Sequence, residues 1–108
     1  MNRKELSEQA LELIAARFKL LGEASRLKII IALEAGEQNV GQIVVATGLT
    51  QANASRHLSA LTESGILARR REGLNIYYEI ADRSIFDLCE SVCGSLQKRL
   101  GAQAKVLG

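Results

Sequence analysis

Proline does not occur in this sequence of 108 residues, and histidine occurs only once, at His57. Without proline, no residue blocks a helix through a fixed φ angle and a missing N–H group. The single histidine argues against an enzyme, as does the lack of a glycine-rich phosphate loop and of paired carboxylates spaced to share a cleft. We therefore expect a largely helical protein that is not an enzyme.

Long apolar runs are also missing. The run Ile29–Leu33 is far shorter than the roughly 20 residues that cross a bilayer, and no charged segment followed by an apolar one opens the chain. We therefore expect a cytoplasmic protein with no membrane partner. The length predicts one domain, residues 1–108, with a modest core. The formal net charge of +2 is too small to indicate nucleic-acid binding by itself.

Two short helices separated by a glycine are predicted in the middle of the chain. The first, Val40–Ala46, is brief and apolar, and Gly48 follows it where a residue with positive φ would end a helix. Thr50 then stands at an N-cap position, and residues 51–64 predict a second helix that Gly65 stops. This is the order of a helix-turn-helix.

The second of these helices has an apolar face, with Ala54, Leu58 and Leu61, and a polar face. The polar face combines small residues with side chains that can pair with base edges in a major groove. The residues expected to read bases are Gln51, Asn53 and Arg56, and those expected to contact the DNA backbone are Thr50, Ser55 and His57. His57 is expected to pack or to touch a phosphate rather than to bind a metal, because no second ligand lies near it in sequence.

A β-hairpin is predicted directly after the second helix. Residues 66–71 and 75–80 are rich in strand-forming residues, and the segment 72–74 between them contains a glycine turn signal. Positive charge at the stem would lie along a phosphate backbone. The residues of the hairpin expected to contact that backbone are Arg69, Arg70, Arg71 and Asn75. An arginine triplet alone more often marks a solvated strand edge, so the prediction depends on the order of elements, which is that of a winged helix-turn-helix.

The same segments resemble the ArsR-type (ArsR/SmtB) bacterial repressors, small dimeric winged-helix proteins that leave their operator when a metal ion or another effector binds. Phe18–Ile30 resembles the family's helix opening, Thr50–Leu61 its recognition helix and Gly65–Tyr78 its wing. Ala24 departs from the pattern, because the family generally has proline there, but a helix can begin without it. The resemblance covers nearly the whole chain. It implies a mostly α fold with a small β-hairpin wing, and a DNA-binding transcriptional repressor.

Further helices are predicted over residues 4–18, 25–33 and 84–100. The last of them carries two apolar stripes, Ile85, Leu88 and Val92 in one and Phe86, Cys89, Cys93, Leu96 and Leu100 in the other. Two stripes are more than one small core requires, so one is expected to contact a partner subunit. We predict a homodimer through the first and last helices, which would place two recognition helices on palindromic double-stranded DNA.

The metal sites known in the family are not available here. The thiolate site that the resemblance places before the recognition helix has no soft ligand in Gln38–Gln42, and the last helix has no histidine for the other common site. Cys89 and Cys93 remain, four residues apart on one helix face.

The two cysteines have two interpretations. In one, they are small hydrophobic residues in a buried seam and the repressor has no effector. In the other, they form a thiol sensor at the dimer interface that responds to oxidation, to persulfide formation or to a soft metal such as arsenite or Cu(I). Neither interpretation requires a cofactor.

A protein-interaction module is the alternative function. Winged helices sometimes dock onto proteins, and the exposed face of the second helix would then be apolar. That face here carries Gln51, Asn53, Arg56 and Ser59, which favours DNA.

Overall fold

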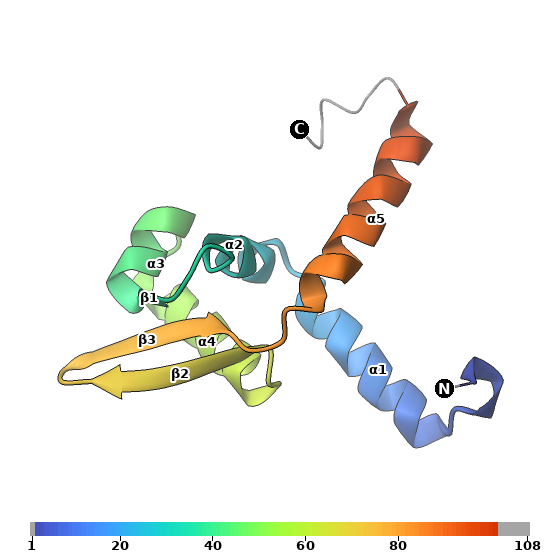
Figure 1. Cartoon of the computed structure of the whole chain (residues 1–108), viewed down its shortest axis with the longest axis horizontal. Coiled ribbons are helices and arrows are strands. Elements are labelled where there is room, and N and C mark those ends of the chain that lie inside the picture. Colours follow the sequence, from blue (N-terminus) through green and yellow to red (C-terminus); the bar gives the residue numbers. More distant parts are fainter. Residues whose placement is uncertain (1, 102–108) are drawn as a thin grey trace.

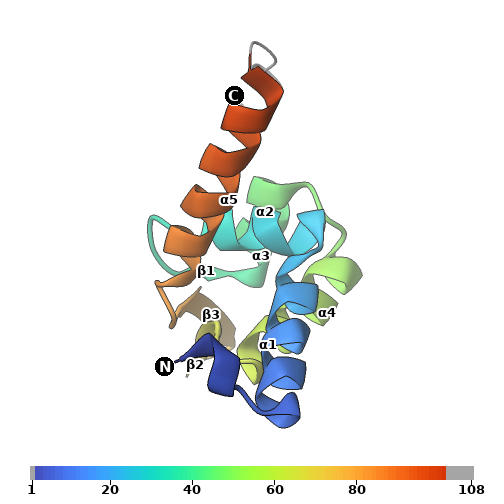
Figure 2. The same ribbon diagram turned by 90° about the vertical axis from the view of Figure 1, so that its right-hand side faces the viewer.

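The computed structural model describes residues 2–101, so residues 1 and 102–108 of the expected domain lie outside the described part. The elements follow in the order η1 (Arg3–Glu5), α1 (Glu8–Leu21), α2 (Ala24–Ala32), β1 (Gln38–Asn39), α3 (Val40–Thr47), α4 (Gln51–Glu63), β2 (Leu67–Glu72), β3 (Asn75–Ile80) and α5 (Ile85–Leu100). In Figure 1, α2, α3, α4 and the strands lie together on one side, and α1 and α5 extend from them in different directions. Figure 2 looks onto the side formed by α1 and α5.

The predicted helix-turn-helix is confirmed. Asn39 caps α3 with a capping box, in which its side chain accepts from the N–H of Gln42 and the Gln42 side chain accepts from the N–H of Asn39. Gly48, with φ of 72°, ends α3, and the Thr50 hydroxyl accepts from Asn53 N at 3.2 Å to begin α4. Each boundary therefore has a local chemical cause that the sequence already contained.

The predicted hairpin is confirmed, and a third strand joins it. Strands β2 and β3 are antiparallel from Leu67↔Ile80 to Glu72↔Asn75, joined at Gly73 with φ of 60°. The sheet order is β1-β3-β2, with β1 pairing β3 through Gln38↔Tyr78. Strand β1 was not predicted, because a strand of two residues shows no alternation.

Helix α1 differs from its predicted range. It begins at Glu8 rather than Lys4, because the Ser7 hydroxyl accepts from Ala10 N at 3.1 Å and so provides the cap. It continues past Phe18 to Leu21, which is buried in the core. Helix α2 begins at Ala24 without a side-chain cap, so the family's missing proline does not prevent the helix.

The core lies among α2, α3, α4 and the sheet. Its buried hydrophobic residues are Leu21, Ile29, Ile30, Leu33, Ile43, Ala54, Leu58, Leu61, Ile66, Leu67, Tyr78 and Ile85. Leu58 and Leu61 of α4 are completely buried, which confirms the predicted apolar face and turns the opposite face of α4 to solvent.

Helices α1 and α5 leave much of their apolar surface uncovered in the single chain. Exposed fractions reach 68% at Leu13 and 56% at Phe18 on α1, and 50% at Val92 on α5. Such exposure across neighbouring helices exceeds the scattered apolar residues that are normal on a surface. Within residues 2–101, the helices are too short or too polar to cross a membrane.

Candidate DNA-binding surface

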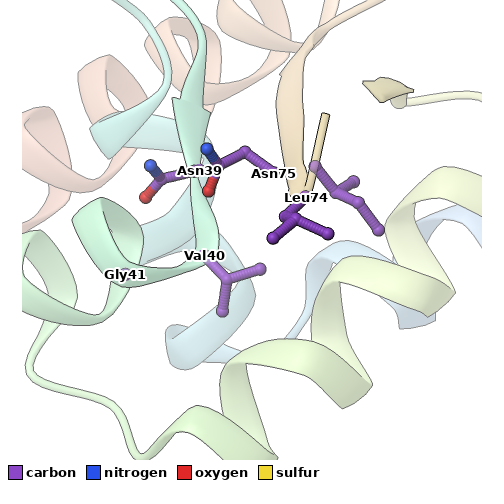
Figure 3. A pocket seen from close by; sticks show the side chains of 6 residues that line it. Asn39, Val40, Gly41, Leu74 and Asn75 are labelled. Carbon is purple, nitrogen blue, oxygen red and sulfur yellow. The ribbon is translucent and has the colours of Figure 1, made fainter. Parts of the chain in front are cut away.

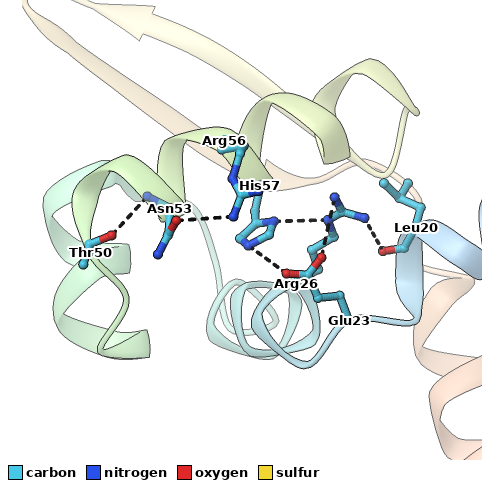
Figure 4. A network of polar contacts seen from close by, with 7 residues as sticks. All are labelled: Leu20, Glu23, Arg26, Thr50, Asn53, Arg56 and His57. Carbon is cyan, nitrogen blue, oxygen red and sulfur yellow. Dashed lines mark hydrogen bonds and ion pairs between the residues drawn. The ribbon is translucent and has the colours of Figure 1, made fainter.

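The polar face of α4 presents the side chains expected to read bases. Gln51, Asn53 and Arg56 are all exposed. The Arg56 Nη2 donates to Asn53 Oδ1 at 3.3 Å, so two of these side chains are already ordered against each other, as Figure 4 shows. Amide and guanidinium groups at this end of a helix can form paired hydrogen bonds with adenine and guanine edges.

Two of the three backbone contacts expected from α4 also lie on the surface. Ser55 and Thr50 are exposed. The Thr50 hydroxyl oxygen caps the helix, which leaves its hydrogen available to a phosphate oxygen.

His57 does not belong to this surface: its burial argues against the expected contact with the DNA backbone and fits the other expectation, that it packs. Its side chain is 2% exposed. Its Nδ1 accepts from Arg26 Nε at 3.2 Å, and its Nε2 lies 3.1 Å from Glu23 Oε1. The helical period explains the position, because His57 lies three residues after Ala54 and four before Leu61, on the core face. That signal was present in the sequence.

The wing arginines separate onto two faces. Arg69 and Arg71 share one face of β2, and Arg70 points to the other because strand residues alternate. Arg69 lines a groove of about 270 Å³ with Ser59 and Glu63 of α4, so this face of the wing adjoins the polar face of α4. Arg71 is exposed and donates from Nε to the Gly73 carbonyl at 3.2 Å.

Arg70 is held within the protein. Its Nε donates to Glu37 Oε2 at 2.9 Å and its Nη1 to Glu72 Oε2 at 2.7 Å, while a further nitrogen contacts Glu37 Oε1. The guanidinium also lies 4.7 Å from the centre of the Tyr77 ring. The hydrogen bond from Arg70 lowers the pKa of Glu37, and the carboxylates raise the pKa of Arg70. These bonds use three of the five guanidinium N–H donors and place two carboxylates beside the charge, which disfavours a phosphate there, so we reassign Arg70 to wing stability.

Leu74, at the tip of the wing, carries no signal in the sequence beyond its place in the turn. Leu74 is 95% exposed there, next to the exposed Asn75, which was expected to contact the DNA backbone. Figure 3 shows both beside the start of α3, around a hollow of about 390 Å³ that Asn39 and Val40 also line.

The two thiols lie on the other side of the molecule, between α1, α2 and α5. Cys89 is half-buried and Cys93 exposed, and both line an apolar cavity of about 520 Å³. The cavity is lined by Phe18, Leu21, Gly22, Leu27, Ile31, Leu88, Cys89, Val92, Cys93 and Leu96. Within residues 2–101 of one chain, no group of three or more His, Cys, Asp or Glu side chains is placed to hold a metal.

Proteins similar to this chain in sequence and structure are regulators of transcription. The family described as "Bacterial regulatory protein, arsR family" matches residues 24–69. The uncharacterized HTH-type transcriptional regulator Rv0081 of Mycobacterium tuberculosis is 31% identical over 102 residues, which are 94% of this chain and 90% of that protein. Its crystal structure matches with a TM-score of 0.79 at 30% identity, covering 91% of this chain and 99% of that one.

Two further relatives add information on assembly and function. The homodimeric winged helix-turn-helix DNA-binding domain Mb0332 of Mycobacterium bovis, a possible ArsR-family regulator, matches with a TM-score of 0.74 at 33% identity, covering 89% and 92% of the two chains. A probable mercury resistance operon repressor of Streptomyces lividans is 32% identical over 71 residues, 66% of this chain. The chain spans only 57% of that repressor and 33% of the mycobacterial regulator Rv0324.

Proposed function

Because this chain belongs to the ArsR family of bacterial regulatory proteins, we propose that it is a homodimeric repressor that binds a palindromic operator and is released by a signal at Cys89 and Cys93. The observation that carries DNA binding is the continuous surface formed by α4 and the wing. On it, Asn53 and Arg56 are exposed and hydrogen-bonded to each other, and Arg69 of the wing lines a groove with Ser59 and Glu63 further along α4. Base-reading and phosphate-binding groups therefore face the same way.

A protein-interaction module is less well supported. Docking onto a protein through α4 would require an apolar exposed face, and the exposed positions of α4 include Gln51, Asn53 and Arg56 instead. The exposed apolar residues lie mainly on α1 and α5, away from this face, where they suit contact with a second copy.

The homodimer is supported by those uncovered faces. Phe18, Val92 and Leu96 are all at least 40% exposed in one chain, and burying such surface against a second copy is favourable by about 25 cal/mol per Å². A two-fold dimer presents two copies of α4, and two copies read two half-sites about one helical turn apart. The homodimeric Mb0332 domain has the same fold.

The thiol signal is supported by the position of the sulfur atoms. Cys89 and Cys93 line a cavity formed by three helices, two of which carry the exposed apolar faces. A change in the size or charge of a sulfur atom there alters how α5 packs, and in a dimer it alters the distance between the two copies of α4. Oxidation, persulfide formation and binding of arsenite or Cu(I) would each have this effect.

The test is fluorescence anisotropy on a duplex that the wild-type protein has selected from a random pool, called the selected duplex below. The reduced protein is measured before and after addition of a mild oxidant, polysulfide, arsenite or Cu(I). At least one reagent is expected to weaken binding roughly 5- to 150-fold, the usual range for coupled sites.

A Cys89→Ser, Cys93→Ser double variant is expected to bind the selected duplex with an affinity that the reagents do not change. Ser91→Ala, at an exposed position of the same helix that does not line the cavity, is the matched control and should respond like the wild type. Binding that no reagent changes would contradict the thiol signal and leave an effector-independent repressor. A wild-type protein that enriches no sequence would contradict the repressor itself.

A further inference from the structure

The buried imidazole of His57 connects the DNA-reading helix to the rest of the molecule. Its Nδ1 accepts from Arg26 Nε, so the ring hydrogen is on Nε2, which donates to Glu23 Oε1 at 3.1 Å. Both ring nitrogens are therefore occupied in a site that is 2% exposed. A buried polar group with all its partners in place specifies one arrangement of the helices around it.

Arg26 extends this connection to α1. Its Nη1 donates to the Leu20 carbonyl at 3.1 Å, and its Nη2 lies 3.7 Å from Glu23 Oε2. One guanidinium thus joins the last turn of α1, the start of α2 and the middle of α4, as Figure 4 shows. A planar fork with several donors fixes direction as well as distance, which an apolar contact of the same area would not do.

A second arginine ties the other end of α4 to α1. Arg17 Nη2 donates to the Ser64 carbonyl, at the C-cap of α4, at 3.2 Å, and Arg17 Nη1 lies 3.7 Å from Asp82 Oδ2, just before α5. Helix α4 is therefore connected to α1 at two points, directly through Arg17 and through Arg26 of α2. An α-helix is stiff over this distance, so two attachments set its angle.

Helix α1, which these bonds connect to α4, carries one of the two uncovered apolar faces. Phe18 lies between the two attachment points on α1, Arg17 and Leu20, and is 56% exposed. Leu21 and Leu27, next in sequence to Leu20 and Arg26, line the cavity between α1, α2 and α5. In the proposed homodimer the same helix that contacts the partner is thus bonded directly to the helix that reads DNA.

We infer that Arg26 and His57 are positioning residues that set which half-site spacing the dimer accepts. This inference rests on the proposed homodimeric repressor. Neither side chain reaches DNA, because His57 is buried and Arg26 lies behind α4 on α2. They act by holding α4 at one angle to α1, so that two copies of α4 enter the major groove at one separation. Arg56, on the opposite face of α4, continues to read bases when the tie is loosened.

The experiment measures two ratios for each protein by anisotropy. The first is the affinity for the selected duplex divided by the affinity for the same duplex with one extra base pair between its half-sites. We call this ratio the spacing penalty. The second is the affinity for the selected duplex divided by the affinity for a duplex with one substituted base pair in each half-site. We call this ratio the base penalty. The proteins are the wild type, Arg26→Lys, His57→Leu and His57→Asn, whose amide oxygen can accept from Arg26 in place of Nδ1.

The wild type is expected to show a spacing penalty of at least about tenfold, since one added base pair turns and shifts one half-site relative to the other. Arg26→Lys and His57→Leu are expected to lower that penalty to about threefold or less while keeping the base penalty, and His57→Asn is expected to retain more of the spacing penalty than His57→Leu. Urea unfolding, read by circular dichroism, identifies the variants that are folded.

Arg83→Lys is the matched control. Arg83 also bridges two segments, donating to the Glu34 carbonyl at 3.1 Å, but it joins the segment just before α5 to the segment just after α2 and does not bond α4. It is expected to keep both penalties. A role of Arg26 and His57 in stability alone would lower the unfolding midpoint and leave both ratios unchanged.

Unchanged spacing penalties in the folded variants would overturn the inference. If His57→Leu does not fold, a wild-type spacing penalty in Arg26→Lys is by itself sufficient to overturn the inference. Failure of the proposed function is seen separately, in the wild-type arm, as the lack of any selected duplex.

Discussion

Neighbouring residues of α4 have opposite roles because one step along a helix turns the side chain by about 100°. Arg56 is exposed and bonded to Asn53, whereas His57, the next residue, is buried against Arg26. Residue type alone did not distinguish them, since histidine and arginine both occur as DNA contacts. The helical phase did, since it places Arg56 on the solvent face, where we propose base reading, and His57 in the core.

Replacing Arg56 with Ala is expected to weaken binding to the selected duplex by about 1 to 3 kcal/mol and to relax the preference at one base position of each half-site. The physical reason is the loss of a bidentate contact with a base edge. Anisotropy on duplexes substituted at single positions measures it. Arg99→Ala removes the same charge from the last turn of α5 and serves as the control. Equal weakening on every duplex would refute base reading by Arg56.

The wing shows the same division within one strand. Alternation along β2 turns Arg69 and Arg71 to the side of α4 or to solvent, and turns Arg70 to Glu37. Glu37 precedes β1, so the carboxylate that occupies Arg70 comes from the segment before the strand that sequence analysis missed. Three consecutive arginines in the sequence thus become two candidate phosphate ligands and one internal contact.

Arg69→Gln and Arg71→Gln are each expected to reduce the slope of log affinity against log salt by about 2 for the dimer, because each removes one phosphate contact in each subunit. Arg70→Gln should leave the slope unchanged and is the matched control in the same strand. A slope unaffected by the first two variants would contradict a wing contact.

The role of Arg70 has its own measurement. Its hydrogen bond lowers the pKa of Glu37, so Arg70→Gln is expected to raise that pKa towards its ordinary value in an NMR titration. Because the pKa is lowered in the folded state, the stabilising contribution is present at neutral pH and is lost as pH falls through the folded value. A Glu37 pKa that does not change would show that Arg70 is free after all.

At the scale of the whole molecule, exposed apolar side chains are clustered on helices, whereas such residues are normally scattered singly over a surface. Most of this apolar surface lies on α1 and α5, at Leu13, Phe18, Val92 and Leu96 among others, and none of it on the exposed face of α4. The two proposed functions are therefore assigned to separate sides, DNA binding to α4 and the wing, and association to α1 and α5. The arginine ties from α1 and α2 to α4 connect them.

Phe18→Glu is expected to convert the protein to a monomer, because it places a charge in an apolar interface, and to weaken binding to the selected duplex by more than tenfold. Light scattering after size-exclusion chromatography gives the mass. Leu74→Glu is the control, since Leu74 is 95% exposed at the wing tip, and its variant should keep the mass of the wild type. A Phe18→Glu protein with unchanged mass would place the interface elsewhere.

The amino-acid sequence determined the features that depend on neighbouring residues. The caps of α3 and α4, the glycine turns, the hairpin register and the apolar face of α4 all arise from interactions within a few residues, which local patterns record. The family followed from the same segments. The phase of α4 even placed His57 in the core, although its residue type suggested a DNA contact.

Only the tertiary structure decided which polar groups meet across the chain. The contact between Arg26 and His57 spans 31 residues, that between Arg70 and Glu37 spans 33, and that between Arg17 and the Ser64 carbonyl spans 47. No local period relates residues so far apart, because their partners are chosen by how helices and strands pack. The roles of the three arginines, two that orient α4 and one that supports the wing, therefore became visible only once the chain was folded.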